Sequence, residues 1–233
     1  MSLARQPRDL EEPVRLAEID LGRLADKLVR AMPELEQAEQ RLAIELYRLL
    51  AAGGPVSPER LARRAALPPG RVARLLESWP GVYFDLRGNV IGFWGLAQAA
   101  AMPPHRFEVG GQKLSTWCAW DALFLPVILG KSARVESTCA TTGERISLTV
   151  GPDGVGEVSP PAAVLSFLRP GEKFDDDVIL NFCHYVLFFS SEEAGSEWVS
   201  RREGAFLLTL GEGFELGRHV VERAFGAGLG GPR

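Results

Sequence analysis

The stretch formed by residues 56–96 constrains the fold most, because it predicts two short helices and a hairpin in a fixed order. Ser57 is a typical helix N-cap residue, and Pro58 suits the first helical position. A Pro-Pro-Gly sequence at 68–70 turns the chain before a second segment of helical periodicity. Alternating segments flank an Arg-Gly-Asn sequence at 87–89, which is a hairpin signal. This order is typical of a winged helix.

The chain before this region predicts helices, and the chain after it predicts a second domain. Apolar residues recur at helical spacing over 13–31 and 34–52, and a Gly-Gly-Pro helix stop follows. A change of composition comes at 97–104. We therefore expect N-terminal helices in 1–52, with the first dozen residues disordered. A winged-helix-like region in 53–96, an α+β catalytic domain in 97–225 and a flexible tail in 226–233 are expected to follow.

The second half predicts short strands separated by glycine and proline, with helices between them. A hairpin is expected to turn at Gly110-Gly111, and a helix is expected to begin near Trp117. Residues 178–189 are rich in β-branched and aromatic residues and predict a buried strand. Further strands are expected at 133–138, 146–150, 163–168 and 205–210, with helices at 190–202 and 214–225. The fold class is α+β, with a mixed, mostly antiparallel β core and flanking helices.

The charge pattern disfavours nucleic acid as a partner. The formal net charge is −4. In the winged-helix-like region the second helix offers Arg71 and Arg74 to a phosphate backbone, and the wing offers only Arg87. A structural or partner-docking role is favoured over DNA binding. No segment resembles a signal peptide and no apolar run approaches about 18 residues, so a cytoplasmic protein without a membrane span is expected.

The spacing of acidic, glycine and serine residues argues against several common kinds of binding and catalytic site. The acidic run at 175–177 lacks the spaced ligands of a calcium loop and is better explained as a solvated loop. The glycine pairs match no nucleotide-binding fingerprint, and no G-x-S-x-G elbow occurs. His184 follows Cys183 on an expected strand, so their side chains should point to opposite faces.

The chain has three cysteines and no CxxC pair, which excludes a disulfide framework and disfavours a zinc site. Most free cysteines are small buried apolar residues, and we interpret Cys139 as structural. Cys118 differs, because a helix beginning near Trp117 would place its thiol in the first turn. Asp121 would then share its face. A thiol and a carboxyl sharing one proton suit sulfur attack coupled to proton delivery, although core packing remains the alternative.

Three segments, TWCAWDALFLP, STCATTGERISLTV and NFCHYVLFF, in this order resemble the organomercurial lyase (alkylmercury lyase) family. The resemblance runs from about residue 50 to 220 and includes the winged-helix-like region. It implies that Cys118, Asp121 and Cys183 are the catalytic residues and that Cys139 is structural. His184 stands where some members carry a second cysteine.

The activity implied by the resemblance is protonolytic cleavage of the carbon–mercury bond of R–Hg⁺, which gives R–H and Hg²⁺. Two thiolates suit mercury because it is a soft metal. Cys118 and Cys183 would hold the Hg²⁺ product with Asp121 nearby, while Asp121 relays the proton. No organic cofactor is implied. Cellular thiols would be needed for turnover, and mercuric reductase would accept the Hg²⁺.

The aromatic residues around the first segment have two interpretations. Trp117, Trp120 and Phe124 are candidates for the wall of a substrate pocket, and ordinary core packing explains each of them as well. The function also has an alternative. A non-catalytic protein that binds mercury or another soft metal, or a metal-responsive regulator, would keep the thiols on the same scaffold without a strict need for Asp121. A relative of the lyases that acts on another soft metal is a third possibility.

Overall fold

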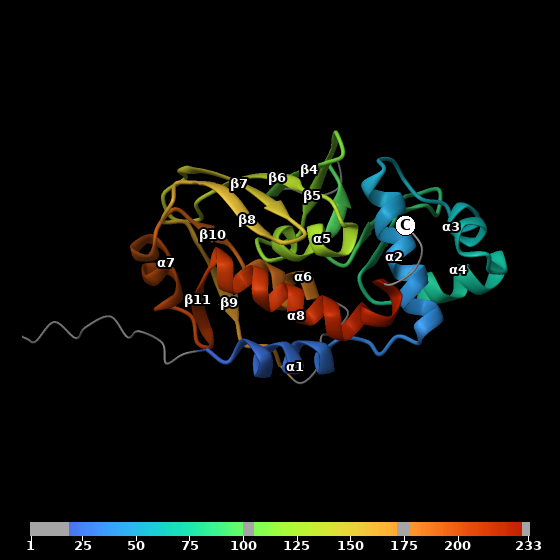
Figure 1. The fold of residues 1–233 in the computed structure, drawn as a ribbon, viewed down its shortest axis with the longest axis horizontal. Coiled ribbons are helices and arrows are strands. Elements are labelled where there is room, and N and C mark those ends of the chain that lie inside the picture. Colours follow the sequence, from blue (N-terminus) through green and yellow to red (C-terminus); the bar gives the residue numbers. More distant parts are fainter. Residues whose placement is uncertain (1–18, 100–104, 172–177, 230–233) are drawn as a thin grey trace, which may run out of the picture.

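The computed structural model describes residues 19–99, 105–171 and 178–229. Helices come first in the chain, and antiparallel sheets with flanking helices follow (Figure 1). The expected α+β class with a mostly antiparallel β core is therefore confirmed. Across these ranges no helix combines the length and the apolar character that a membrane span requires.

The first helices are α1 (Leu21–Ala31), α2 (Gln37–Ala51), α3 (Pro58–Ala65) and α4 (Pro69–Ser78). The predicted cap of α3 is confirmed, because the Ser57 side chain accepts the backbone N–H of Arg60 at 3.2 Å. The helix expected over 13–31 begins at Leu21, directly after the N-cap Asp20, and residues 13–18 lie outside the described ranges.

The larger sheet contains eight strands among the described residues, in the order β1-β2-β3-β5-β4-β6-β7-β8, and all neighbours are antiparallel. The strands are β1 (Val82–Phe84), β2 (Val90–Phe93), β3 (Leu96–Gln98), β4 (His105–Val109), β5 (Gln112–Thr116), β6 (Ala133–Thr138), β7 (Arg145–Gly151) and β8 (Gly154–Ser159). The predicted turn at Gly110-Gly111 is confirmed between β4 and β5. The boundary expected near residue 96 falls in β3, which pairs with both β2 and β5, so the sheet is continuous across it.

A smaller sheet has the order β10-β9-β11, with β9 (Val164–Leu168), β10 (Phe188–Phe189) and β11 (Ala205–Thr209). The remaining helices are α5 (Asp121–Leu129), α6 (Val178–Asn181), the 3₁₀ helix η1 (Cys183–Tyr185), α7 (Glu192–Val199) and α8 (Leu210–Leu229). The long helix α8 packs against α1, α2 and α5, and Figure 1 shows it running between α1 and α5. This packing joins the N-terminal helices to the second half of the chain.

The strand predicted over 178–189 is wrong. This segment forms α6 and η1, and only its last two residues, Phe188 and Phe189, pair as β10. A short buried apolar run does not distinguish a strand from a helix, because tertiary contacts decide. Here the Ser166 hydroxyl on β9 donates to the Tyr185 carbonyl at 2.8 Å and accepts the Leu187 N–H at 3.0 Å.

The bounds of the last helix need correction, and two of the observed strands were not predicted. The last helix begins at Leu210 rather than at 214 and continues to Leu229, so the first residues of the expected tail are helical. The sequence analysis did not predict strands β3 and β8. The acidic run at 175–177 lies outside the described residues.

Candidate active site

The loop between β5 and α5 carries the first half of the site. Asp121 is the first residue of α5 and Trp120 is its N-cap, so Cys118 precedes the helix and the predicted start near Trp117 is wrong. The Asp121 side chain accepts the backbone N–H of Cys118 at 2.8 Å. The loop is fixed on its other side, because the backbone N–H of Ala119 donates to the Val186 carbonyl at 3.0 Å.

The bond from Ala119 to Val186 ties this loop to the segment that carries the second half of the site. Cys183 begins η1, and the ligand atoms of Cys118, Asp121 and Cys183 all lie within 4.8 Å of one another. All three side chains are buried. His184 is exposed whereas Cys183 is buried, although the two residues lie on a 3₁₀ helix rather than on a strand. The structure therefore brings two thiols and one carboxyl together in one buried cluster.

Burial dominates the electrostatics of this cluster. It raises the pKa of Asp121 to about 7, although hydrogen bonds with Cys118 and with the backbone N–H of Trp117 act in the opposite direction. Burial also raises the pKa of Cys118 well above its usual value, and the hydrogen bond with Cys183 and the charge of Asp121 add to the rise. The prediction that a helix N-terminus favours the Cys118 thiolate is thus wrong.

Cys183 has a raised pKa as well. Its hydrogen bond with Cys118 lowers the pKa, but burial and the charge of Asp121 together raise it by more. At neutral pH the two thiols therefore hold their protons, and the carboxyl lies close to half-protonation. A carboxyl in this state both accepts and releases a proton readily.

A small cavity of about 40 Å³ borders Asp121 and Cys183. Trp117, Trp120 and Phe124 all line it, and their role as the wall of a substrate pocket remains a prediction. Apolar side chains on α1, α6 and α8, or directly after α1 and α6, also line it, namely Leu28, Met32, Val178, Phe182, Val221 and Phe225. These residues were missed, because only the tertiary fold brings N-terminal α1 and C-terminal α8 to the cavity beside Asp121 and Cys183.

Cys139 lies apart from this cluster, just after β6 at the turn into β7. Its Sγ lies 3.4 Å from the Thr141 hydroxyl oxygen. Burial raises the pKa of the Cys139 thiol, but hydrogen bonds from Thr141, Thr142 and Ser190 outweigh this effect and lower the pKa to about 6. The structural role expected for this cysteine remains a prediction.

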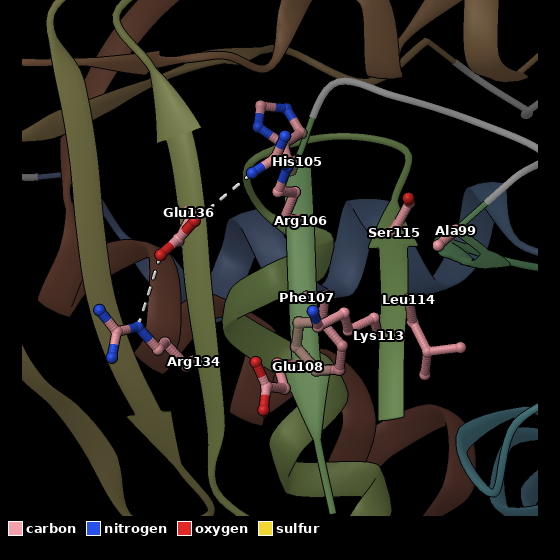
Figure 2. Close-up of a pocket in the computed structure, with 10 residues that line it drawn as sticks. All are labelled: Ala99, His105, Arg106, Phe107, Glu108, Lys113, Leu114, Ser115, Arg134 and Glu136. Carbon is pink, nitrogen blue, oxygen red and sulfur yellow. Dashed lines mark ion pairs between the residues drawn. The ribbon is translucent and has the colours of Figure 1, made fainter. Parts of the chain in front are cut away.

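A larger recess of about 760 Å³ lies over β4, β5 and β6 (Figure 2). It is lined by charged side chains, including Arg106, Arg134 and Glu136. Glu136 pairs with Arg106 at 3.8 Å and with Arg134 at 3.6 Å, as Figure 2 shows. None of the three clustered residues lines this recess, so its size does not make it the candidate site.

The α+β fold and this site define a class of protein: one whose two buried thiols and carboxyl, beside an apolar wall, have the chemistry that suits a soft metal. The sequence profile described as alkylmercury lyase matches residues 99–222. The alkylmercury lyase of Pseudomonas putida is 39% identical over 182 residues, which cover 78% of this chain and 84% of that protein. The Streptomyces lividans enzyme is 40% identical over 177 residues, covering 76% and 80%.

The chain belongs to the alkylmercury lyase family, and its activity is that of an alkylmercury lyase. The resemblance seen in the three sequence segments is therefore confirmed. A solved structure titled "Crystal structure of the mercury-bound form of MerB2" has the same fold, with a TM-score of 0.66 and 21% identity. The similarity covers 86% of this chain and 96% of that one.

Proposed function

We propose that Cys118, Asp121 and Cys183 together cleave the carbon–mercury bond. The observation that carries this proposal is the clustering of their ligand atoms within 4.8 Å in a buried site. Two sulfurs are the ligands that mercury prefers, and a carboxyl competes weakly with them for the metal. The third side chain is therefore available for proton transfer.

The reaction can be written as a balanced sequence. An organomercurial arrives as R–Hg–SR′, and the Cys118 sulfur replaces the external thiolate, whose sulfur leaves with the proton of Cys118 as R′SH. The Cys183 sulfur then binds the same mercury, and its proton passes to the Asp121 carboxylate. Asp121 delivers that proton to carbon, and the electron pair of the carbon–mercury bond forms the new C–H bond of R–H. Hg²⁺ remains between the two sulfurs.

The apolar wall explains why the organic group enters this site. Trp117, Trp120 and Phe124 border the cavity beside Asp121, and we assign them contacts with the organic group R. Trp120 is fixed, because its indole N–H donates to the Gly213 carbonyl at 2.9 Å. An apolar surround also strengthens the attraction between the sulfurs and mercury, because no water screens it.

The partners follow from the chemistry. Cellular thiols deliver the substrate and remove Hg²⁺ from the two cysteines, and mercuric reductase is the final acceptor. No organic cofactor has a place in these steps. A cytoplasmic location suits the reaction, because both cysteines must be reduced before each turnover. Residues 97–225 supply the reacting groups, and the winged-helix-like region has a structural role rather than a role in nucleic-acid binding.

Incubation of the protein with phenylmercury and excess thiol tests the proposal, with benzene release as the readout. Cys118→Ser, Asp121→Asn and Cys183→Ser should each abolish release, while Cys139→Ser is the control that keeps it. Stoichiometric binding of mercury without benzene would instead support the alternative of a mercury-binding or regulatory protein. Full activity of Asp121→Asn would contradict the proton relay and leave the two thiols as the whole site.

A further inference from the structure

The turn between β2 and β3 reaches the candidate active site from the winged-helix-like region. Trp94 and Gly95 form this turn, with backbone φ angles of 28° and 90°. The Gly95 carbonyl accepts the backbone N–H of Trp117 at 3.1 Å, next to Cys118 in the chain. Both turn residues also border the cavity beside Asp121 and Cys183. The turn is thus part of the site, although no sequence motif marked it.

Gly95 lies directly against the carboxyl of Asp121. A Cβ atom added to Gly95 would lie 2.6 Å from both Cγ and Oδ1 of Asp121, and 2.9 Å from its Cβ. Atoms do not approach so closely without displacing one another. The positive φ independently favours glycine here. The backbone of this turn therefore closes one side of the Asp121 carboxyl, and only a residue without a side chain leaves room for it.

The turn is itself held by residues outside the domain that supplies the cysteines. The Tyr47 hydroxyl on α2 donates to the Trp94 carbonyl at 2.9 Å. The Trp94 indole N–H donates to the Pro80 carbonyl at 2.6 Å, and the Trp94 backbone N–H donates to the Gly81 carbonyl at 3.1 Å. A hydrogen bond from α2 and two hydrogen bonds to the residues just before β1 thus fix a turn that is strained at Trp94.

We propose that Gly95 is a positioning residue for proton delivery, through which the helical and winged-helix-like region holds the Asp121 carboxyl against the two thiols. This inference rests on the proposed role of Asp121 as the proton carrier. A carboxyl moved by about 1 Å loses its alignment with the carbon that it must protonate. The three atoms nearest to an added Cβ all belong to Asp121 and none is a sulfur, so capture of the organomercurial should survive such a displacement.

The substitution Gly95→Ala tests the proposal, with Gly88→Ala as its matched control. Gly88 has a φ of 77°, and a Cβ there would have no atom within 4 Å, so the control carries the backbone strain without the contact. One equivalent of phenylmercury is added without external thiol. All variants carry Cys139→Ser, so that loss of free thiol reports capture by Cys118 and Cys183 alone. Cleavage is followed by benzene release in a single turnover.

Gly88→Ala should release benzene close to the wild-type rate. Gly95→Ala should capture phenylmercury but release benzene on the order of tenfold to a hundredfold more slowly. Release from Gly95→Ala at the rate of the control overturns the proposal. A folded Gly95→Ala protein that captures no phenylmercury also overturns it, because the residue then supports the site as a whole and not proton delivery.

If Gly95→Ala does not fold, Tyr47→Phe tests whether the turn at Gly95 positions Asp121 for proton delivery. It removes the hydroxyl that holds the Trp94 carbonyl and keeps the ring that lies 4.9 Å from the Phe93 ring. Normal capture with slower release supports the proposal, and unchanged release overturns it. Asp121→Asn in the same assay distinguishes a failure of the proposed function from a failure of the positioning role of Gly95. If Asp121→Asn still releases benzene, the proposed function fails. If it does not while Gly95→Ala does, only the positioning role fails.

Discussion

The Asp121 carboxylate accepts the backbone N–H of Cys118 at 2.8 Å, so the acid is tied to the main chain beside the thiol. This bond does not use the Cys118 sulfur, which stays available for mercury. It also survives any substitution at Cys118 other than proline, because the backbone N–H remains. The backbone bond therefore still holds the acid when the Cys118 side chain, whose thiol also hydrogen-bonds Asp121, is replaced.

Replacing the two thiols of the proposed site one at a time should leave different mercury-bound forms of the protein. In a Cys139→Ser background, which removes the third thiol, Cys183→Ser should still capture one phenylmercury through Cys118, whereas Cys118→Ser should capture none in the proposed sequence of steps. Both should lose benzene release by on the order of a thousandfold, because a hydroxyl is a poor ligand for a soft metal. Mass spectrometry of the intact protein distinguishes the two outcomes. Equal capture by both variants would contradict the assignment of Cys118 as the first nucleophile.

Asp121 should make the stability of the protein fall as the pH rises. Its pKa is about 7 in the folded protein, against an ordinary value of 3.8. Between these values the folded state binds more protons than the unfolded state, so the free energy of unfolding decreases with pH. The loss is complete above about pH 7 and amounts to on the order of 4 kcal/mol.

Asp121→Asn removes this titration and keeps an oxygen that can accept the Cys118 N–H. The variant should therefore gain stability relative to the parent as the pH rises from about 4 to about 7. Urea unfolding at several pH values measures the difference. Asp153→Asn, at an exposed position in the turn between β7 and β8, is the control and should show no such trend. A difference that stays constant with pH would mean that Asp121 does not titrate in this range.

The spacing of Cys118 and Asp121 was the most informative local feature, and the structure confirms that the two residues are neighbours. The reason given for it was wrong, because Cys118 lies in a loop and burial raises its pKa. Nothing in the local pattern around Cys183 indicated that it meets them. That expectation came from the family resemblance, since the contact joins segments 65 residues apart.

The residues that border the cavity show why the remaining parts of the site could not be predicted from the sequence. Leu28 on α1 and Phe225 on α8 border the same cavity, although nearly the whole chain separates them. Helical periodicity predicts that both residues face a core, but not which core. Gly95 is a similar case. Its positive φ could be guessed from its place in a turn, whereas its contact with Asp121 depends on how β3 joins the sheet.

Cys139→Ala should leave the cleavage activity unchanged and lower the stability of the protein. The Cys139 thiol contacts Thr141 and not the cluster, so benzene release should be unchanged. The lowered pKa of about 6 means that the folded state favours the thiolate. The contribution of this thiol to stability is therefore largest at alkaline pH and is lost as the pH falls through 6. The free energy of unfolding should drop by about 1 kcal/mol at neutral pH. Loss of activity in a folded variant would refute the structural assignment.

Leu28→Ala should change the choice of substrate, because α1 forms part of the pocket wall. Leu28 is fully buried and borders the cavity beside Asp121 and Cys183. Removing its side chain should cost about 2–4 kcal/mol and enlarge the space for the organic group. Leu46→Ala on α2 is the matched control, because Leu46 is equally buried and does not line the cavity. Both variants should lose similar stability in urea unfolding, but only Leu28→Ala should cleave bulkier arylmercurials faster relative to phenylmercury. If the two variants shift this ratio equally, α1 covers the site without shaping its selectivity.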